Sequence, residues 1–231
     1  MHWIDPDSLP EVSGTVERFV LNPRGEVDGF VMTREGSAVL VHTPPHMEAE
    51  LTGHIQKGDH VSVHGVRPRG ADLLAAVAVT AKHGRRIVDN GPDHDREHAE
   101  VDHRKLDAEG TVRLSLFGPK GELRGALLTD GTVVRIGPKE AEEVADLLAP
   151  RATLAVRGDG VETPFGRVIH AREAGKTLAA LQPLKHGKPG PAGKHGPKHD
   201  LKHDPKHGPK HGPKHKPPHK PKHDRADDAH A

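Results

Sequence analysis

The sequence has no cysteine, no tyrosine and an aromatic content of only 2%. Without cysteine, disulfide frameworks, thiolate metal sites and cysteine nucleophiles are excluded. No apolar run reaches the roughly 18 residues of a transmembrane helix. The first ten residues, MHWIDPDSLP, lack the basic and apolar regions of a secretory signal. From these absences we expect a cytoplasmic protein with no membrane partner.

Catalytic motifs are also missing. No serine lies in a nucleophile elbow, and the sequence contains neither a phosphate loop nor a dinucleotide fingerprint. Carboxylate pairs occur, but no pattern brings two of them into one pocket. We therefore expect no enzymatic activity.

Charge divides the chain into two regions. Residues 184–231 hold twelve Lys and Arg against five Asp and Glu, whereas residues 1–183 hold 22 against 28. Hydrophobic residues make up 33% of the 231 residues, so part of the chain should not pack into a core. The pattern predicts a basic arm on a slightly acidic folded body.

An internal repeat organises the folded body. The segment GTV at 14–16 returns at 110–112, and PRGEVDG at 23–29 returns at the same spacing as PKGELRG at 119–125. A one-residue deletion then aligns Gly36 with Gly131. So many matches in the same order indicate a tandem duplication.

Each copy has the pattern of three strands, a helix and two strands. In the first copy the strands are predicted at 15–21, 27–33, 38–42, 61–66 and 73–80, and the helix at 45–55. In the second copy PKEAEEVADLL at 138–148 has the proline, the early glutamates and the apolar stripe of a short helix.

This order of elements is that of an OB fold. The predicted fold class is mainly β: two tandem five-stranded OB-type barrels, each with one short helix, followed by a disordered tail. The predicted bounds are 11–88 for the first barrel, 89–109 for an acidic, histidine-containing linker, 110–183 for the second barrel and 184–231 for the tail.

Two segments of the first copy, GTVxxFxxNPRGEVDGFV and GDHVSVHGVRP, resemble small bacterial OB-fold domains related to nucleic-acid-binding proteins. The resemblance extends over both copies. It implies the OB fold, and it implies nucleic acid as a ligand, although OB barrels also bind oligosaccharides and proteins.

OB barrels bind ligands on the face of strands 2 and 3, between the loop that joins strands 1 and 2 and the loop that joins strands 4 and 5. The first loop carries Arg24 in copy one and Lys120 in copy two, and the second carries Arg67 and Arg69 in copy one. These four cations are predicted phosphate contacts. The alternative is that they are ordinary solvated turn residues.

Aromatic rings for base stacking are scarce, with one Trp and four Phe. The alternation at 112–117 predicts that Val112, Leu114 and Leu116 face the core, which leaves Phe19 and Phe117 on the opposite face. There they stack bases, or they cover a barrel end or a domain interface. Phe30 is expected in the core, and Phe165 lies in a loop of undetermined role.

The predicted linker contains His94 and His98, which would share one face of a helix with Asp95 nearby. Such a trio is a candidate metal clip. The alternative is a solvated acidic connector.

In the tail, histidine recurs every four residues, nearly always after a lysine. Frequent proline excludes a helix and favours polyproline II, in which successive histidines are rotated by about 120° and form no preformed metal site. The tail can still fold back so that neutral imidazoles coordinate Ni²⁺, Zn²⁺ or Cu²⁺. The predicted metal ligands are His195, His199, His203, His207, His211, His215, His219 and His223.

The same extended arm suits a phosphate backbone, because its lysines point in all directions. Histidine would add positive charge as pH falls. The predicted phosphate contacts of the tail are Lys198, Lys202, Lys206, Lys210 and Lys214.

Three hypotheses follow for the whole chain. The first is non-enzymatic, sequence-independent nucleic-acid binding by the barrels and the pH-sensitive tail, with no cofactor required. The second is binding or buffering of Ni²⁺, Zn²⁺ or Cu²⁺ by the tail, with the barrels as a scaffold or as protein-docking modules. The third is an adaptor for a protein or an envelope polymer.

Overall fold

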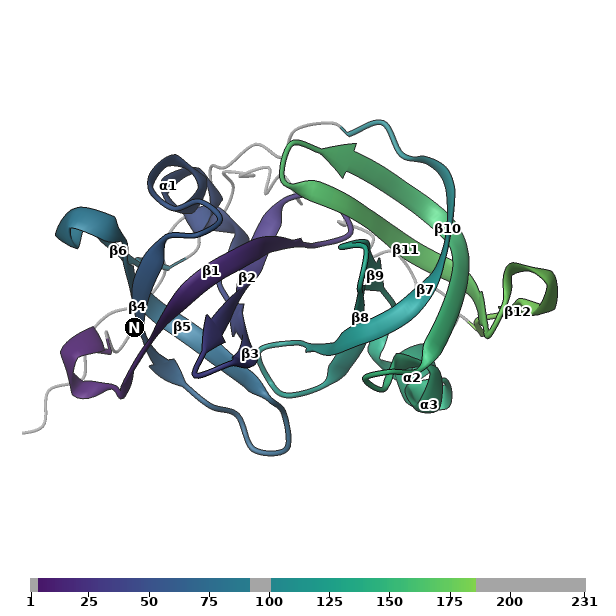
Figure 1. The fold of residues 1–231 in the computed structure, drawn as a ribbon, viewed down its shortest axis with the longest axis horizontal. Helices are drawn as coiled ribbons and strands as arrows, with labels where there is room; N and C mark the ends of the chain where they lie inside the picture. The colour runs from purple at the N-terminus through teal and green to yellow at the C-terminus, as the bar shows by residue number, and fades with distance from the viewer. Residues whose placement is uncertain (1–3, 92–100, 186–231) are drawn as a thin grey trace, which may run out of the picture. The chain divides into compact units, whose positions relative to one another are not determined.

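The computed structural model describes residues 4–91 and 101–185 (Figure 1). These ranges form two closed five-stranded barrels, one from each copy of the repeat, so the predicted mainly-β tandem OB architecture is confirmed. The predicted tail sites and the His94–His98 clip lie outside the described residues. Among the described residues, none of the helices combines the length and the apolar character needed to cross a membrane.

The first barrel has the strand order β3-β2-β1-β4-β5, and parallel pairing of β3 with β5 closes it. A 3₁₀ turn (Pro45–Met47) and helix α1 (Glu48–His54) lie between β3 and β4. Strand β6 (Arg86–Val88) pairs with β5. The barrel strands are β1 (Glu11–Leu21), β2 (Val27–Arg34), β3 (Ser37–His42), β4 (His60–Val66) and β5 (Leu73–Thr80).

The second barrel repeats this order, and parallel pairing of β9 with β11 closes it. Its helical segment is divided at Val144, whose φ of −117° separates α2 (Pro138–Glu143) from α3 (Ala145–Leu148). The barrel strands are β7 (Arg104–Phe117), β8 (Leu123–Leu128), β9 (Val133–Arg135), β10 (Thr153–Thr163) and β11 (Gly166–Gly175), and β12 (Gln182–Pro183) pairs with β11. Strand β7 begins before residue 110 because residues 104–110 pair with β10.

The duplication is visible in the backbone as well as in the sequence. The turn after β1 closes with a hydrogen bond from Asn22 N to Glu26 O at 2.8 Å, and the turn after β7 has its equivalent from Gly118 N to Glu122 O at 2.8 Å. The turn glycines, Gly25 and Gly121, have φ of 83° and 84°, a region that favours glycine. Both first strands also carry two β-bulges, at matching positions.

The first of these bulges corrects the predicted side-chain phase. In β7 the register shifts between Val112 and Leu114, so Val112 faces the barrel core while Leu114 and Leu116 face the other barrel. An extra residue inverts the alternation of every residue that follows it. The equivalent bulge in β1 places Phe19 opposite the core residue Phe30, which is fully buried as predicted.

Each barrel has its own core, and a third apolar cluster joins the two. We call this third cluster the seam. Its buried members from the first barrel are Val20, Leu21, Val27, Val31, Leu40 and Leu73, and those from the second are Leu116, Leu127, Val133, Val161 and Val168. The barrels therefore pack through a continuous hydrophobic interface.

Candidate nucleic-acid interface

The seam covers the face on which OB barrels usually bind ligands. Val31 on β2 and Leu40 on β3 are 0% and 5% exposed, and Leu127 on β8 and Val133 on β9 are 0% and 1% exposed. All four belong to the seam. The outer β2–β3 face of the first barrel is thus buried against the corresponding face of the second, so a ligand can reach it only at the edges of the seam or in the hollows that the packing leaves.

The loops around the seam meet in two crossed pairs. A Cβ at Gly25, in the turn after β1, would lie 2.8 Å from Val161 on β10, and a Cβ at Gly121, in the turn after β7, would lie 3.2 Å from the carbonyl oxygen of Arg69. The first turn of each barrel therefore packs against the β4–β5 or β10–β11 region of the other. This crossed arrangement has the form of an approximate two-fold interface.

The predicted loop cations divide between these two contacts. Lys120 and the loop of Arg67 and Arg69 meet at one contact, and Arg24 lies at the other. All four residues are exposed, and Arg67 lies 3.5 Å from the carboxylate of Asp72. Their role in binding phosphate stays a prediction.

Two adjoining hollows at the edge of the seam share Arg18. One, of about 310 Å³, is lined by Arg18, Phe19, Phe165, Arg167 and the loop at 130–133. The other, of about 350 Å³, is lined by Arg18, Lys57, Arg113 and their neighbours on β1. We call the two together the Arg18 groove. It brings cations from four separate segments of the chain alongside two aromatic rings.

The two rings form an edge-to-face pair. Phe165 lies in the β10–β11 hairpin, and its ring centroid is 5.5 Å from that of Phe19 with an interplanar angle of 82°. Phe19 is half-buried against the seam and the first core, whereas Phe165 is 37% exposed. Of the two, Phe165 is the ring accessible for stacking. Phe117 is also half-buried against the seam, in keeping with the predicted alternative that it covers an interface.

Two arginines in the groove carry buried donors without a partner. Neither Arg18 Nε nor Arg167 Nε donates a hydrogen bond to any described residue, and the nearest carboxylate oxygen to Arg167 Nε, from Glu162, is 3.6 Å away. Buried polar atoms are normally paired. Both arginines line the first hollow, and although Arg167 is paired with Glu162, two guanidinium groups in one hollow make it suited to an oxyanion.

Carboxylates partly neutralise the positive charge of the groove. Burial disfavours the ionised form of Glu17, but hydrogen bonds from Thr33 and Arg113 outweigh it and hold the pKa of Glu17 below its ordinary value. Glu17 therefore neutralises Arg113, and Asp130 lies at the opposite end. Four cations and two carboxylates line the groove, and with Glu162 beside Arg167 the cations still outnumber the carboxylates by one.

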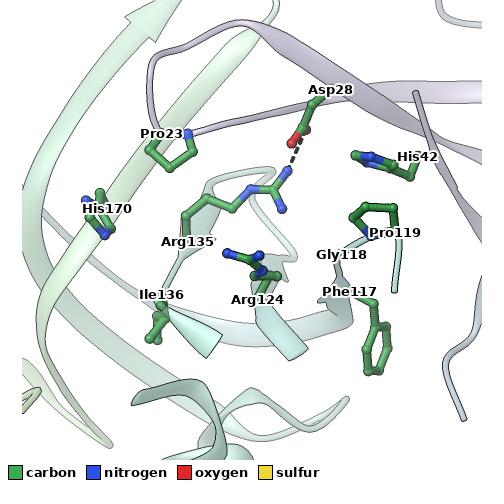
Figure 2. Close-up of a pocket in the computed structure, with 11 residues that line it drawn as sticks. Pro23, Asp28, His42, Phe117, Gly118, Pro119, Arg124, Arg135, Ile136 and His170 are labelled. Atoms are coloured by element: carbon green, nitrogen blue, oxygen red, sulfur yellow. Dashed lines mark hydrogen bonds and ion pairs between the residues drawn. The ribbon is translucent and has the colours of Figure 1, made fainter. Parts of the chain in front are cut away.

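A second feature, the seam pocket, lies between the two barrels on β2, β3, β8 and β9 (Figure 2). It has a volume of about 250 Å³, and the turns after β1 and β7 contribute Pro23 and Pro119. Arg135 crosses from the second barrel to the first. Its Nη2 donates to Asp28 Oδ1 at 2.5 Å, and its Nε donates to the carbonyl oxygen of Leu21 at 2.8 Å.

Burial governs ionisation in the seam pocket. It raises the pKa of Asp28 in spite of the opposing charge of Arg135, whose side chain is only 10% exposed. Burial also lowers the pKa of His42. Arg124 donates from Nε and Nη2 to Glu122 Oε1, at 3.1 and 2.8 Å. The pocket thus combines two guanidinium groups with one buried carboxyl group.

The described residues contain no cluster of three or more His, Asp or Glu that could hold a metal ion. The predicted metal ligands of the tail fall outside these residues and stay predictions. The sequence analysis did not identify Arg18, Lys57 or Arg113 as site residues. Of the groove residues, Phe165 is the one that the sequence could have indicated, because an aromatic ring between Pro164 and Gly166 is expected in an exposed hairpin turn.

Models of known protein families gave no match, and neither did curated protein sequences. Among solved structures, the chain is similar to the crystal structure of wild-type single-stranded DNA binding protein from Thermus aquaticus, at 16% identity and a TM-score of 0.23, over 80% of this chain and 97% of that one. The OB assignment rests on the strand pairing of the two barrels and not on this match.

Proposed function

We propose that the protein binds single-stranded nucleic acid, without enzymatic action and without sequence specificity, along the Arg18 groove. The observation that carries the proposal is that Phe165, Arg18 and Arg167 line one hollow. Single-strand binders combine a cationic path for the backbone with an aromatic ring for a base.

The geometry supports a defined division of roles. Phe165 would stack on one base, Arg18 and Arg167 would bind the adjacent phosphate, and Lys57 would extend the path. Arg24 lies on the turn that packs against Thr163, beside the Phe165 hairpin, and would continue the path in the other direction. Because none of these groups reads a base edge, binding would be independent of sequence.

The tail would supply further sequence-independent affinity through its regularly spaced lysines. Each phosphate neutralised on a single strand contributes about 0.7 to the slope of log K against log salt. Deleting residues 184–231 should therefore flatten that slope for both DNA and RNA. An unchanged slope would show that the tail has no part in binding.

The groove itself is tested by fluorescence anisotropy with an oligo(dT) that carries a 5′-hydroxyl. Phe165→Ala should lower affinity roughly 5- to 150-fold, because stacking contributes about 1–3 kcal/mol per base. The matched control is Ile4→Ala, which removes an exposed apolar side chain elsewhere. Equal affinities for the two variants would refute a stacking role for Phe165.

Arg18→Gln should reduce the salt slope by about 0.7, the contribution of one phosphate contact. Arg157→Gln is the control, since Arg157 is paired with Asp107 and Glu173 on the outer face of the second barrel. The proposal fails if both arginine variants leave the slope at the wild-type value.

A further inference from the structure

We propose that the seam pocket is a binding site for a phosphate group, separate from the Arg18 groove. The pocket lies where the two barrels meet, and both contribute to its lining. A site of this kind exists only when the barrels are packed together. Its residues take no part in the function proposed above, so the two proposals can fail independently.

Arg124 and Arg135 supply the positive charge of the seam pocket. In Figure 2 both side chains are drawn among the residues that line the pocket, and they come from the paired strands β8 and β9. Each uses Nε and Nη2 for hydrogen bonds within the protein. A guanidinium group has five N–H donors, two of them on Nη1. Within the described residues neither Nη1 has a hydrogen-bond acceptor, so both are available to one oxyanion.

Both arginines are preorganised by hydrogen bonds within the protein. Arg135 is held by Asp28 and by the Leu21 carbonyl, both in the first barrel, and Arg124 is held by Glu122 through two hydrogen bonds to one oxygen. Arginines fixed in this way lose little side-chain entropy when they bind. An incoming phosphate would meet donors that are already in position.

The size and the lining of the seam pocket also suit a phosphate group. About 250 Å³ is below the usual range for drug-sized ligands, and it suits a phosphate or the phosphate end of a larger molecule. Pro23, Phe117 and Ile136 provide apolar walls. Charge-assisted hydrogen bonds are stronger in such a setting than in water.

Asp28 is the carboxyl group that opposes an anion here. Its charge is matched by Arg135, whose Nη2 donates to Asp28 Oδ1 at 2.5 Å, and burial raises its pKa. Glu122 holds Arg124 but does not line the pocket. His42, whose pKa is lowered by burial, offers a ring nitrogen without adding charge. The lining therefore favours an oxyanion over a cation.

The test is isothermal titration of the full-length protein with inorganic phosphate. We expect one saturable site that Arg124→Gln weakens at least about tenfold, because a hydrogen bond to a charged group contributes more than a neutral one. The control is Arg157→Gln, on the outer face. Phosphate bound by the tail is the same in both variants, so the difference between them reports on the pocket.

Equal phosphate affinity in Arg124→Gln and Arg157→Gln, or no saturable site at all, overturns the proposal. Two further ligands separate the sources of the phosphate. A 5′-phosphorylated oligo(dT) that gains affinity over its 5′-hydroxyl form, with the gain lost in Arg124→Gln, identifies a strand end. Competition by AMP with inorganic phosphate, without that gain, identifies a free small molecule. Phe165→Ala should leave phosphate binding unchanged, so failure here differs from failure of the groove.

Discussion

Neighbouring leucines on β8 offer a direct test of the seam. Leu127 and Leu128 are both 0% exposed, yet Leu127 belongs to the seam and Leu128 to the core of the second barrel. Replacing each with alanine removes the same atoms from two different places. The comparison therefore separates the coupling of the barrels from the stability of one barrel.

The overall losses should be similar in size. Truncating a fully buried leucine to alanine costs about 2–5 kcal/mol, through lost transfer free energy and the cavity that remains. For a unit of this size, each kcal/mol lowers Tm by about 2–4 °C. What differs is where the destabilisation appears, because Leu127 belongs to the cluster that includes Val31 and Leu40 of the first barrel, whereas Leu128 belongs to the core of the second barrel.

Hydrogen exchange followed by mass spectrometry measures this distribution. Leu127→Ala should reduce the protection of β2 and β3 in the first barrel as well as that of β8 and β9. Leu128→Ala should reduce protection mainly in the second barrel. If Leu127→Ala alters exchange only in the second barrel, as Leu128→Ala does, the seam does not stabilise the first barrel and the interpretation is wrong.

Three further outcomes are expected. Gly125→Ala should lower the free energy of unfolding, measured in urea, by more than about 1–3 kcal/mol, because φ is 142° and a Cβ would overlap the Val134 carbonyl oxygen. Gly36→Ala should cost less, because a Cβ there would lie in open space. Equal losses in the two variants would contradict the steric argument. The raised pKa of Asp28 means that the folded state binds its proton more tightly, so its stabilising contribution is present below the ordinary carboxyl pKa and is lost as pH rises through the folded value. Asp159, whose pKa is lowered first by Lys105 and then by Arg172, acts in the opposite sense, with a contribution present above the ordinary pKa and lost as pH falls. Urea midpoints of Asp28→Asn and Asp159→Asn across the acidic range should change in opposite directions, and parallel changes would refute these assignments. Titration with Ni²⁺ or Zn²⁺ should show several weak equivalents that disappear when residues 184–231 are deleted, and heats unaffected by the deletion would exclude the tail histidines as ligands.

The strands and turns could be predicted from the sequence because local chemistry determines them. The β1–β2 turn needs a glycine with positive φ, and PRG at 23–25 supplies it just as PKG at 119–121 does. The predicted strand at 73–80 has the same bounds as β5. Because the strand and turn patterns occur in both copies, the order of the elements could be predicted from the sequence.

The bulges could not be predicted, because no residue type at Glu17 or Arg113 requires an extra residue in the strand. The seam did leave a signal. Strands buried on both faces are apolar without alternation, as in GFVM at 29–32 and GALL at 125–128. The groove could hardly be predicted from the sequence, because Arg18, Arg113 and Phe165 come together only through the packing of the barrels.

The duplication itself explains one ion pair at the seam. Glu17 and Arg113 occupy equivalent positions in the two copies, and their side chains bond to each other. Near a two-fold axis, equivalent residues meet, so two identical barrels would bring like charges together at this position. Two copies in one chain are free to differ, and a glutamate opposite an arginine turns that repulsion into attraction. The edges of the seam differ in the same way: Arg18 and Phe19 line the groove at one edge, and the equivalent positions at the other edge hold Leu114 and Ser115, which supply neither a cation nor an aromatic ring.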